Sequence, residues 1–230
     1  MMNRTSPGVA GAAPAPSEAP AEAPIATRAV GRLAALWSPE FRLRTAAIWV
    51  VWFCVNFSYY GAFIWLPSLL YRSGFPLVRS FEFTLIITLA QLPGYAVAAW
   101  LIEKWGRRPT LATFLAGSAV AAVGFGVANA EWSILLTGCL LSFFNLGAWG
   151  ALYAVGPELY PTTLRGTGAG AAAAFGRIAS IIAPLAVPVM LASGGSGLVF
   201  GVFGAAFALA AAAATRLPES AAWSRASTIS

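Results

Sequence analysis

The longest apolar run of the chain extends from Gly166 to Thr215, and Arg177 is the only charged residue inside it. A bilayer crossing takes about 20 residues, so this run is long enough to cross a membrane twice. The cluster Ser193–Gly197, which reads SGGSG, is typical of a turn and divides the run into two helices. The run therefore predicts two membrane-spanning helices, one of which carries a charge in its interior.

Charged residues divide the preceding part of the chain into four more uncharged runs of crossing length. These runs are Thr45–Tyr71, Phe83–Ile102, Pro109–Ala130 and Trp132–Pro157. The composition agrees, since 59% of the residues are hydrophobic and only 10% are charged. We therefore predict an all-α membrane protein with six transmembrane helices.

The remaining segments flank this six-helix domain, for which we expect residues 45–216. Residues 1–30 are rich in Ala, Pro, Gly and Glu and predict a disordered tail, with no continuous apolar stretch of a signal peptide. Residues 31–44 form a basic lead-in, which either contacts the membrane surface or simply flanks the first crossing. Residues 217–230 form a second tail.

Basic residues are distributed unequally between the two ends of the predicted helices. Ten Lys and Arg residues lie near the membrane on the side of the termini, against two on the other side, Arg72 and Arg79. The positive-inside rule then predicts cytoplasmic termini and a multi-pass protein of the plasma (inner) membrane. The same rule accounts for the net charge of +6, so we expect the lipid bilayer and no nucleic acid as a partner.

Polar and aromatic residues recur at helical spacing on the first, second, fourth and fifth predicted helices. Polar groups in hydrocarbon need partners or water, so these four helices are expected to line a polar cavity, with the third and sixth outside. The alternative is that single amides such as Asn56, Gln91 and Asn145 only join neighbouring helices. The residues predicted to bind substrate are Arg177, Asn56, Tyr60, Gln91, Tyr95, Asn145, Trp149 and Tyr153.

Arg177 is the strongest functional candidate because a charge inside a membrane span is costly. No Asp or Glu lies within the predicted spans to pair with it. Its planar donors suit a carboxylate, which predicts an anionic small-molecule substrate, in particular a small organic acid. The alternatives are that the guanidinium reaches the membrane surface or pairs with backbone carbonyls.

The short loops on the side of the termini carry a second cluster of charges. We predict that this cluster forms a cytoplasmic gate between helices, while the alternative is that its arginines only set the topology. The gate residues are Glu103, Gly106, Arg107, Arg108, Glu158 and Arg165. In the same region, Thr162 and Thr163 are possible N-caps of the fifth helix.

An enzyme is not expected from this sequence. A nucleophile needs a base or a metal, and the chain has no histidine and no carboxylate in a predicted span. Cys54 and Cys139 each lie in the middle of an apolar run, as buried small residues do. We therefore predict no catalytic residues, no metal site and no cofactor.

Two loops carry a family resemblance. EKWGRRP at 103–109 resembles the acid-x-x-Gly-Arg-Arg loop of the major facilitator superfamily, and PELYPTTLRGTG at 157–168 resembles the loop between its tenth and eleventh helices. RLPES at 216–220 is similar to the end of its twelfth helix. The flanking segments resemble the metabolite:proton symporter branch, which includes niacin-like and aromatic-acid carriers and synaptic-vesicle-glycoprotein-like proteins.

The resemblance implies that the six helices correspond to helices 7–12 of a twelve-helix carrier. It implies secondary active transport of a small organic acid or related metabolite, coupled to protons, as one half of an alternating-access carrier. A separate amino-terminal half, or a second copy of the chain, would then be the partner. The alternative is a truncated carrier fragment, or a membrane interaction protein, without transport activity of its own.

Overall fold

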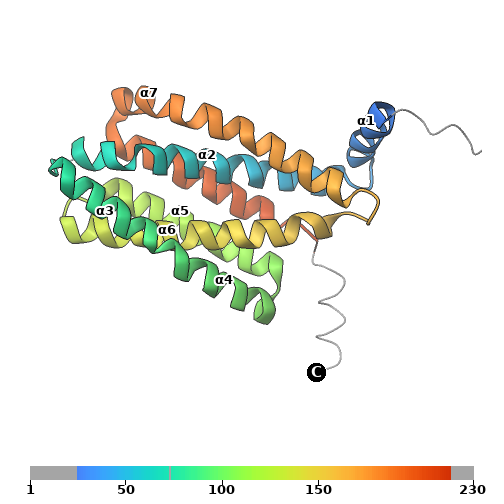
Figure 1. Cartoon of the computed structure of the whole chain (residues 1–230), viewed down its shortest axis with the longest axis horizontal. Helices are drawn as coiled ribbons and strands as arrows, with labels where there is room; N and C mark the ends of the chain where they lie inside the picture. Colours follow the sequence, from blue (N-terminus) through green and yellow to red (C-terminus); the bar gives the residue numbers. More distant parts are fainter. Residues whose placement is uncertain (1–24, 73, 219–230) are drawn as a thin grey trace, which may run out of the picture.

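The computed structural model describes residues 25–72 and 74–218, and every regular element within them is a helix (Figure 1). The elements are α1 (Ile25–Leu36), α2 (Arg42–Arg72), α3 (Leu77–Leu89), α4 (Gln91–Trp105), α5 (Arg107–Val127), α6 (Glu131–Val155), the 3-10 turn η1 (Gly156–Leu159) and α7 (Arg165–Ala214). The prediction of an all-α protein is confirmed. Of the tails expected at residues 1–30 and 217–230, residues 1–24 and 219–230 lie outside the described residues.

The element α7 is two helices joined by a sharp turn. Gly194 and Gly195 have non-helical backbone angles, and the φ of +67° at Gly195 is one that glycine adopts at low cost. Ala183 and Phe203 lie on opposite sides of this turn, yet both contact the position where Gly61 of α2 would carry a Cβ. The chain therefore doubles back at the predicted turn, as Figure 1 shows, and α7 contributes two crossings.

Five helical stretches are long and apolar enough to cross a membrane, and the longest of them is the doubled α7. Six crossings result, as predicted. The second crossing, Leu77–Trp105, consists of α3 and α4 with an interruption at Ala90, and it begins six residues before the expected Phe83. The difference arises because Arg79 is tolerated in α3, where it forms an ion pair with Glu131 at the start of α6.

Close packing between the crossings depends on small residues that let the backbones approach. A Cβ at Gly94 of α4 would overlap the backbone carbonyl of Phe143 in α6. A Cβ at Gly147 of α6 would overlap the ring of Phe114 in α5. The helices α4, α5 and α6 are thus held together at contacts that leave no room for a side chain.

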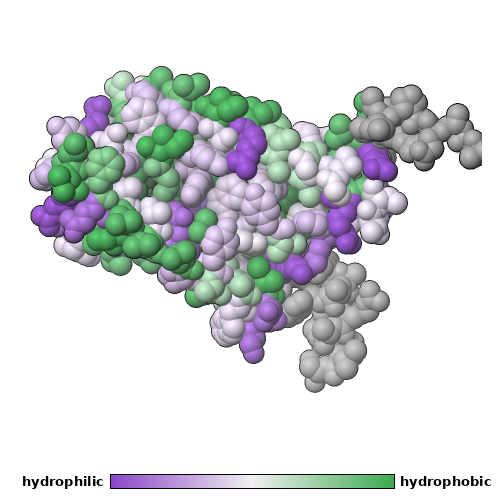
Figure 2. Space-filling model, viewed as in Figure 1, coloured by the Kyte–Doolittle hydropathy of each residue, from purple (hydrophilic) through white to green (hydrophobic). Residues whose placement is uncertain are grey.

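The two ends of the bundle differ in what they carry. One end, here called the terminal end, holds α1, the α4–α5 loop, η1, the start of α7 and residues 215–218 (Figure 1). The opposite end holds the Arg79–Glu131 pair and the turn at Gly194. On the face shown in Figure 2, most hydrophilic residues lie toward the two ends, and hydrophobic residues cover much of the side between them. This distribution matches a protein that spans a bilayer.

Helix α1 lies at the terminal end and begins at Ile25, so residues 25–30 are helical although the sequence analysis placed them in the disordered tail. Its last residue is tied to α2, because the Thr45 hydroxyl donates a hydrogen bond to the Leu36 carbonyl at 2.8 Å. Trp37 and Trp49 meet edge to face, with ring centroids 5.2 Å apart. The basic lead-in is therefore a short helix fixed against the first crossing.

Candidate functional site

Arg177 of α7 lies beside Tyr60 of α2. Its Nη1 atom donates a hydrogen bond to the Tyr60 hydroxyl at 2.8 Å, and the guanidinium has no ion-pair partner among the described residues. The preceding residue brings the two helices together, since a Cβ at Gly176 would lie 2.7 Å from Asn56 Nδ2 and 3.0 Å from the Trp52 carbonyl. Glycine at 176 thus lets α7 approach α2 closely enough for the arginine to reach the tyrosine.

An aromatic cluster joins α2 to α6, and we define it as Trp52, Tyr59, Tyr60, Trp149 and Tyr153. The Trp52 ring lies edge to face with Trp149 at 5.6 Å and with Tyr153 at 5.1 Å. Tyr59 bridges the cluster, since its ring centroid is 5.8 Å from that of Trp149 and 5.3 Å from that of Tyr60. The predicted Tyr60, Trp149 and Tyr153 are therefore brought into one group, which extends to Arg177 through Tyr60.

Tyr59 and Trp52 are members of this group that the predicted site does not contain. A signal for them exists in the sequence, because Trp52, Asn56, Tyr59 and Phe63 follow one another at helical spacing of three or four residues. The adjacent tyrosines at 59 and 60 share this face of α2. To tell from the sequence which of the two tyrosines contacts α6, one must know where α6 packs, and the periodicity of α2 alone does not contain this information.

The predicted amides are buried inside the bundle instead of lining an open surface. Asn56 is 0%, Gln91 7% and Asn145 1% exposed. Asn56 Nδ2 donates to the Trp52 carbonyl at 2.8 Å, while the amide oxygen and nitrogen of Asn145 have no hydrogen-bond partner in the described part of the chain. Buried amides are normally satisfied, so Asn145 has unused capacity both to donate and to accept.

Unpartnered groups continue along the aromatic cluster. The indole Nε1 atoms of Trp52 and Trp149 are buried without an acceptor, as is Asn56 Oδ1 without a donor. Tyr95 and Tyr153 are exposed, and the Tyr95 ring lies against Gly150 of α6, 3.0 Å from where a Cβ would be. The region between α2, α4 and α6 thus combines flat aromatic faces with hydrogen-bonding atoms that have no internal partner.

The predicted gate residues lie at the terminal end. Arg107 at the start of α5 forms an ion pair with Glu158 of η1, and Gly106 makes the turn before it with a φ of +92°. Arg108 donates to the Thr215 carbonyl at 2.5 Å. Glu103 and Arg165 are exposed and have no ion-pair partner within residues 25–72 and 74–218.

Two hydrogen bonds that the predicted gate does not include also tie this end together. The Tyr160 hydroxyl and Thr45 Oγ1 are 2.9 Å apart, and Arg44 Nη1 donates to the Leu159 carbonyl at 3.1 Å. Burial raises the pKa of Tyr160, so its phenol stays neutral at physiological pH. These contacts fix the loop between α6 and α7 to the start of α2.

The expected caps of the fifth crossing are wrong. The N-cap of α7 is Leu164, and it makes no side-chain capping bond. Thr162 and Thr163 are exposed in the preceding turn, where the Leu164 amide donates to the Pro161 carbonyl at 2.9 Å. The helix therefore begins one to two residues later than it would with either threonine as its cap.

Comparison with known proteins supports the resemblance. The model of the sugar (and other) transporter family matches residues 17–221. Over 181 residues the chain is 50% identical to the niacin transporter NiaP of Acinetobacter baylyi, covering 78% of this chain and 41% of that protein. Over 178 residues it is 51% identical to the putative niacin/nicotinamide transporter NiaP of Bacillus subtilis, covering 77% and 44%.

A more distant relative is the inner membrane metabolite transport protein YdjE of Escherichia coli, which is 32% identical over 179 residues, with coverage of 76% and 39%. The chain thus spans about two fifths of the length of these relatives. The family and the relatives are transporters and not enzymes. The family match extends from the region before α1 to beyond the last described residue, so the chain belongs to the sugar (and other) transporter family of the major facilitator superfamily.

Proposed function

We propose that this chain supplies half of the substrate site of a carrier for a small aromatic monocarboxylate. The observation that carries the proposal is Arg177, a guanidinium inside an apolar helix whose side-chain partner among the described residues is only the neutral Tyr60 hydroxyl. A hydroxyl satisfies one donor but leaves the positive charge uncompensated. A bound carboxylate supplies the missing charge and can accept two parallel hydrogen bonds from the planar guanidinium.

The aromatic cluster supports a flat, unsaturated substrate body. Its rings offer faces and edges for stacking, which favours a planar ring over a flexible chain. The buried amide of Asn145 offers a donor for a ring nitrogen. Niacin, which two relatives are named for, is a pyridine ring with one carboxylate and has both features. We therefore place niacin or a close analogue in the candidate site.

A binding experiment with matched ligands tests this proposal. Nicotinate is expected to bind the purified carrier at least about ten-fold more tightly than nicotinamide, because only the carboxylate makes a charged hydrogen bond to Arg177. Calorimetry or competition with labelled nicotinate measures the ratio. Benzoate, which keeps the carboxylate but lacks the ring nitrogen, reports on Asn145 separately. Equal affinity for nicotinate and nicotinamide would contradict the role of Arg177.

We further propose that transport needs six more helices beside these six. The relatives support the idea, since the chain spans only about two fifths of their length, as does the exposure of Arg177, Tyr95 and Tyr153 on this chain. The two halves of such carriers share one orientation and meet at the substrate path. The basic residues of the terminal end favour cytoplasmic termini by the positive-inside rule. A separate amino-terminal half or a second copy would complete the path.

Reconstitution distinguishes a half-carrier from a fragment without activity. In vesicles that hold one chain each, we expect no nicotinate uptake, because the candidate site then faces lipid on one side. Co-reconstitution with an amino-terminal half, or a high protein-to-lipid ratio, is expected to restore uptake. Uptake per chain that stays constant down to one chain per vesicle would refute the partner requirement. No uptake under any of these conditions would favour the fragment.

The coupling proton would bind to the partner half. Among the described residues, the carboxylates lie near the ends of the crossings and not in their centres. They are Glu40, Glu82, Glu103, Glu131 and Glu158. A proton site at the depth of Arg177 therefore has no candidate in the described part of this chain, and we place the acidic group in the other half.

The Arg107–Glu158 pair is proposed to bias the carrier toward one orientation. Both side chains are partly exposed, at 36% and 30%, so Glu158→Gln is expected to cost at most about 1 kcal/mol of stability. A conformational equilibrium with a gap of a few kcal/mol still responds to such a change.

For Glu158→Gln we expect a cysteine introduced at Ser180 to be alkylated faster from one membrane side and more slowly from the other. Glu131→Gln, which breaks an ion pair at the opposite end, is the matched control. Equal losses of folded protein and activity in Glu158→Gln would indicate a structural role only.

A further inference from the structure

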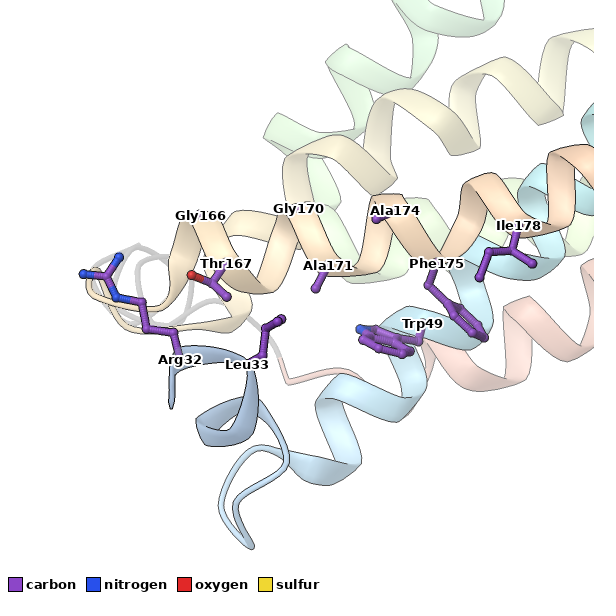
Figure 3. Close-up of a pocket in the computed structure, with 10 residues that line it drawn as sticks. All are labelled: Arg32, Leu33, Trp49, Gly166, Thr167, Gly170, Ala171, Ala174, Phe175 and Ile178. Atoms are coloured by element: carbon purple, nitrogen blue, oxygen red, sulfur yellow. The ribbon is translucent and has the colours of Figure 1, made fainter. Parts of the chain in front are cut away.

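A groove of about 820 Å³ opens at the terminal end between α1, α2 and the first half of α7 (Figure 3). None of the residues of the candidate site lines it. Its lining residues are Arg32, Leu33, Trp49, Gly166, Thr167, Gly170, Ala171, Ala174, Phe175 and Ile178. The groove is therefore separate from the candidate site in its lining residues.

The walls of the groove are apolar and its mouth is cationic. Trp49 and Phe175 stack with ring centroids 4.7 Å apart and form one end, while Arg32 lies at the other (Figure 3). Arg165, next to the lining Gly166, is exposed and has no ion-pair partner within the described ranges. In Figure 3 the Trp49 indole nitrogen lies on the side of the ring nearer to Leu33, and it has no acceptor among the described residues.

The groove is also unobstructed along α7. Apart from the adjacent residues and the backbone of the same helix turn, no heavy atom of the described residues lies within 4 Å of where a Cβ would stand at Gly166 or Gly170. An apolar groove that runs from a charged mouth along a transmembrane helix fits a ligand with a long apolar chain and a charged headgroup. The groove offers few hydrogen-bonding groups to a compact polar substrate, because Arg32, Thr167 and the indole of Trp49 are the only polar side chains among its lining residues.

We propose that this groove binds a phospholipid with an anionic headgroup. One acyl chain lies along Gly170, Ala174 and Ile178, and the headgroup phosphate sits beside Arg32. The apolar walls alone would not select a lipid, since bulk lipid tails solvate such walls equally well. Selection comes from the headgroup, because each arginine near an anionic membrane surface attracts it. Helix α1, basic and fixed at the terminal end, holds the mouth in place.

The proposal depends on the membrane class of the chain and not on its transport activity. Native mass spectrometry of the full chain, released from nanodiscs of equal parts phosphatidylglycerol and phosphatidylcholine, tests it. The wild type is expected to retain one phosphatidylglycerol molecule in clear preference to phosphatidylcholine. Arg32→Gln is expected to lower this preference about five-fold, since one cationic contact is lost. Arg72→Gln, at the opposite end of α2, is the control and leaves the preference unchanged.

Two variants test whether the groove itself holds the lipid. Gly170→Leu places a side chain in the groove, and Gly166→Leu does so closer to the mouth. Both are expected to abolish lipid retention. Gly201→Leu is the matched control, since this glycine of α7 also has no atom within 4 Å of a Cβ and lies outside the groove. Wild-type retention in both filled variants would overturn the proposal. Equal retention of both lipids by the wild type would also overturn it. So would a wild-type dimer that dissociates in the filled variants, because the groove would then bind a second protein copy.

Discussion

Replacing Arg177 by alanine is expected to lower nicotinate uptake by the completed carrier at least about thirty-fold, through the affinity for substrate. Truncating one partner of a buried, hydrogen-bonded charge pair costs about 2–5 kcal/mol, which corresponds to that loss or more. Folding should suffer little, because the guanidinium has no ionic partner among the described residues and loses only the hydrogen bond to Tyr60. Uptake of labelled nicotinate, normalised to folded carrier, measures the effect.

Two milder variants separate charge from geometry. Arg177→Lys keeps the charge but loses the planar pair of donors, so an intermediate loss of about ten-fold is expected. Tyr60→Phe removes only the neutral hydrogen bond to Arg177, and a loss of about five-fold follows from a net contribution near 1 kcal/mol. If uptake by Arg177→Ala equals that of the wild type, the guanidinium serves topology or packing and the site lies elsewhere.

Introducing alanine at Gly94 is expected to destabilise the bundle by about 3 kcal/mol or more. The added methyl group would overlap the backbone carbonyl of Phe143, which cannot rotate away as a side chain can. Helices α4 and α6 would have to separate along their contact, and the exposed Tyr95 face of α4 would shift with them. Thermal unfolding in detergent, followed by circular dichroism, measures the change.

The control for this variant is the same substitution where there is room. Gly170→Ala meets no atom within 4 Å and should stabilise α7 by up to about 1 kcal/mol, since alanine favours helix over glycine. If Gly94→Ala lowers the stability and Gly170→Ala raises it, then packing and not helix propensity decides the effect at Gly94. A Gly94→Ala protein with the melting temperature of the wild type would show that α4 and α6 are not in contact there.

Most of the bundle could be predicted because charges mark the limits of its crossings. The turn at Gly194 and Gly195 was predictable from the glycine cluster, which has few alternatives inside an apolar run. The start of the second crossing was not, because Arg79 and Glu82 interrupt the apolar run in the sequence. Arg79 is accommodated by the ion pair with Glu131 of α6, a partner 52 residues away.

The candidate site was predictable one helix at a time. Arg177 stood out because nothing charged surrounds it in sequence, and Tyr60 because it lies on the polar face of its helix. The aromatic cluster was not predictable as a unit, since the meeting of Trp52 with Tyr153 depends on the register between α2 and α6. The burial of Asn145 is likewise a property of neighbouring helices, which helical periodicity within α6 does not contain.

The uncompensated charge of Arg177 has an electrical consequence. Twelve residues separate it from Arg165 at the start of α7, which places it about 18 Å along the helix, near the middle of a hydrocarbon core of about 30 Å. One elementary charge that crosses 100 mV changes in energy by about 2.3 kcal/mol. In the proposed carrier, a deprotonated acidic group of the other half would cancel this charge in the empty state, and a bound monoanion would cancel it once that group is protonated. We therefore expect voltage to act little on either step, and a strong effect of voltage on the return of the empty carrier would indicate that the other half carries no acid at this depth.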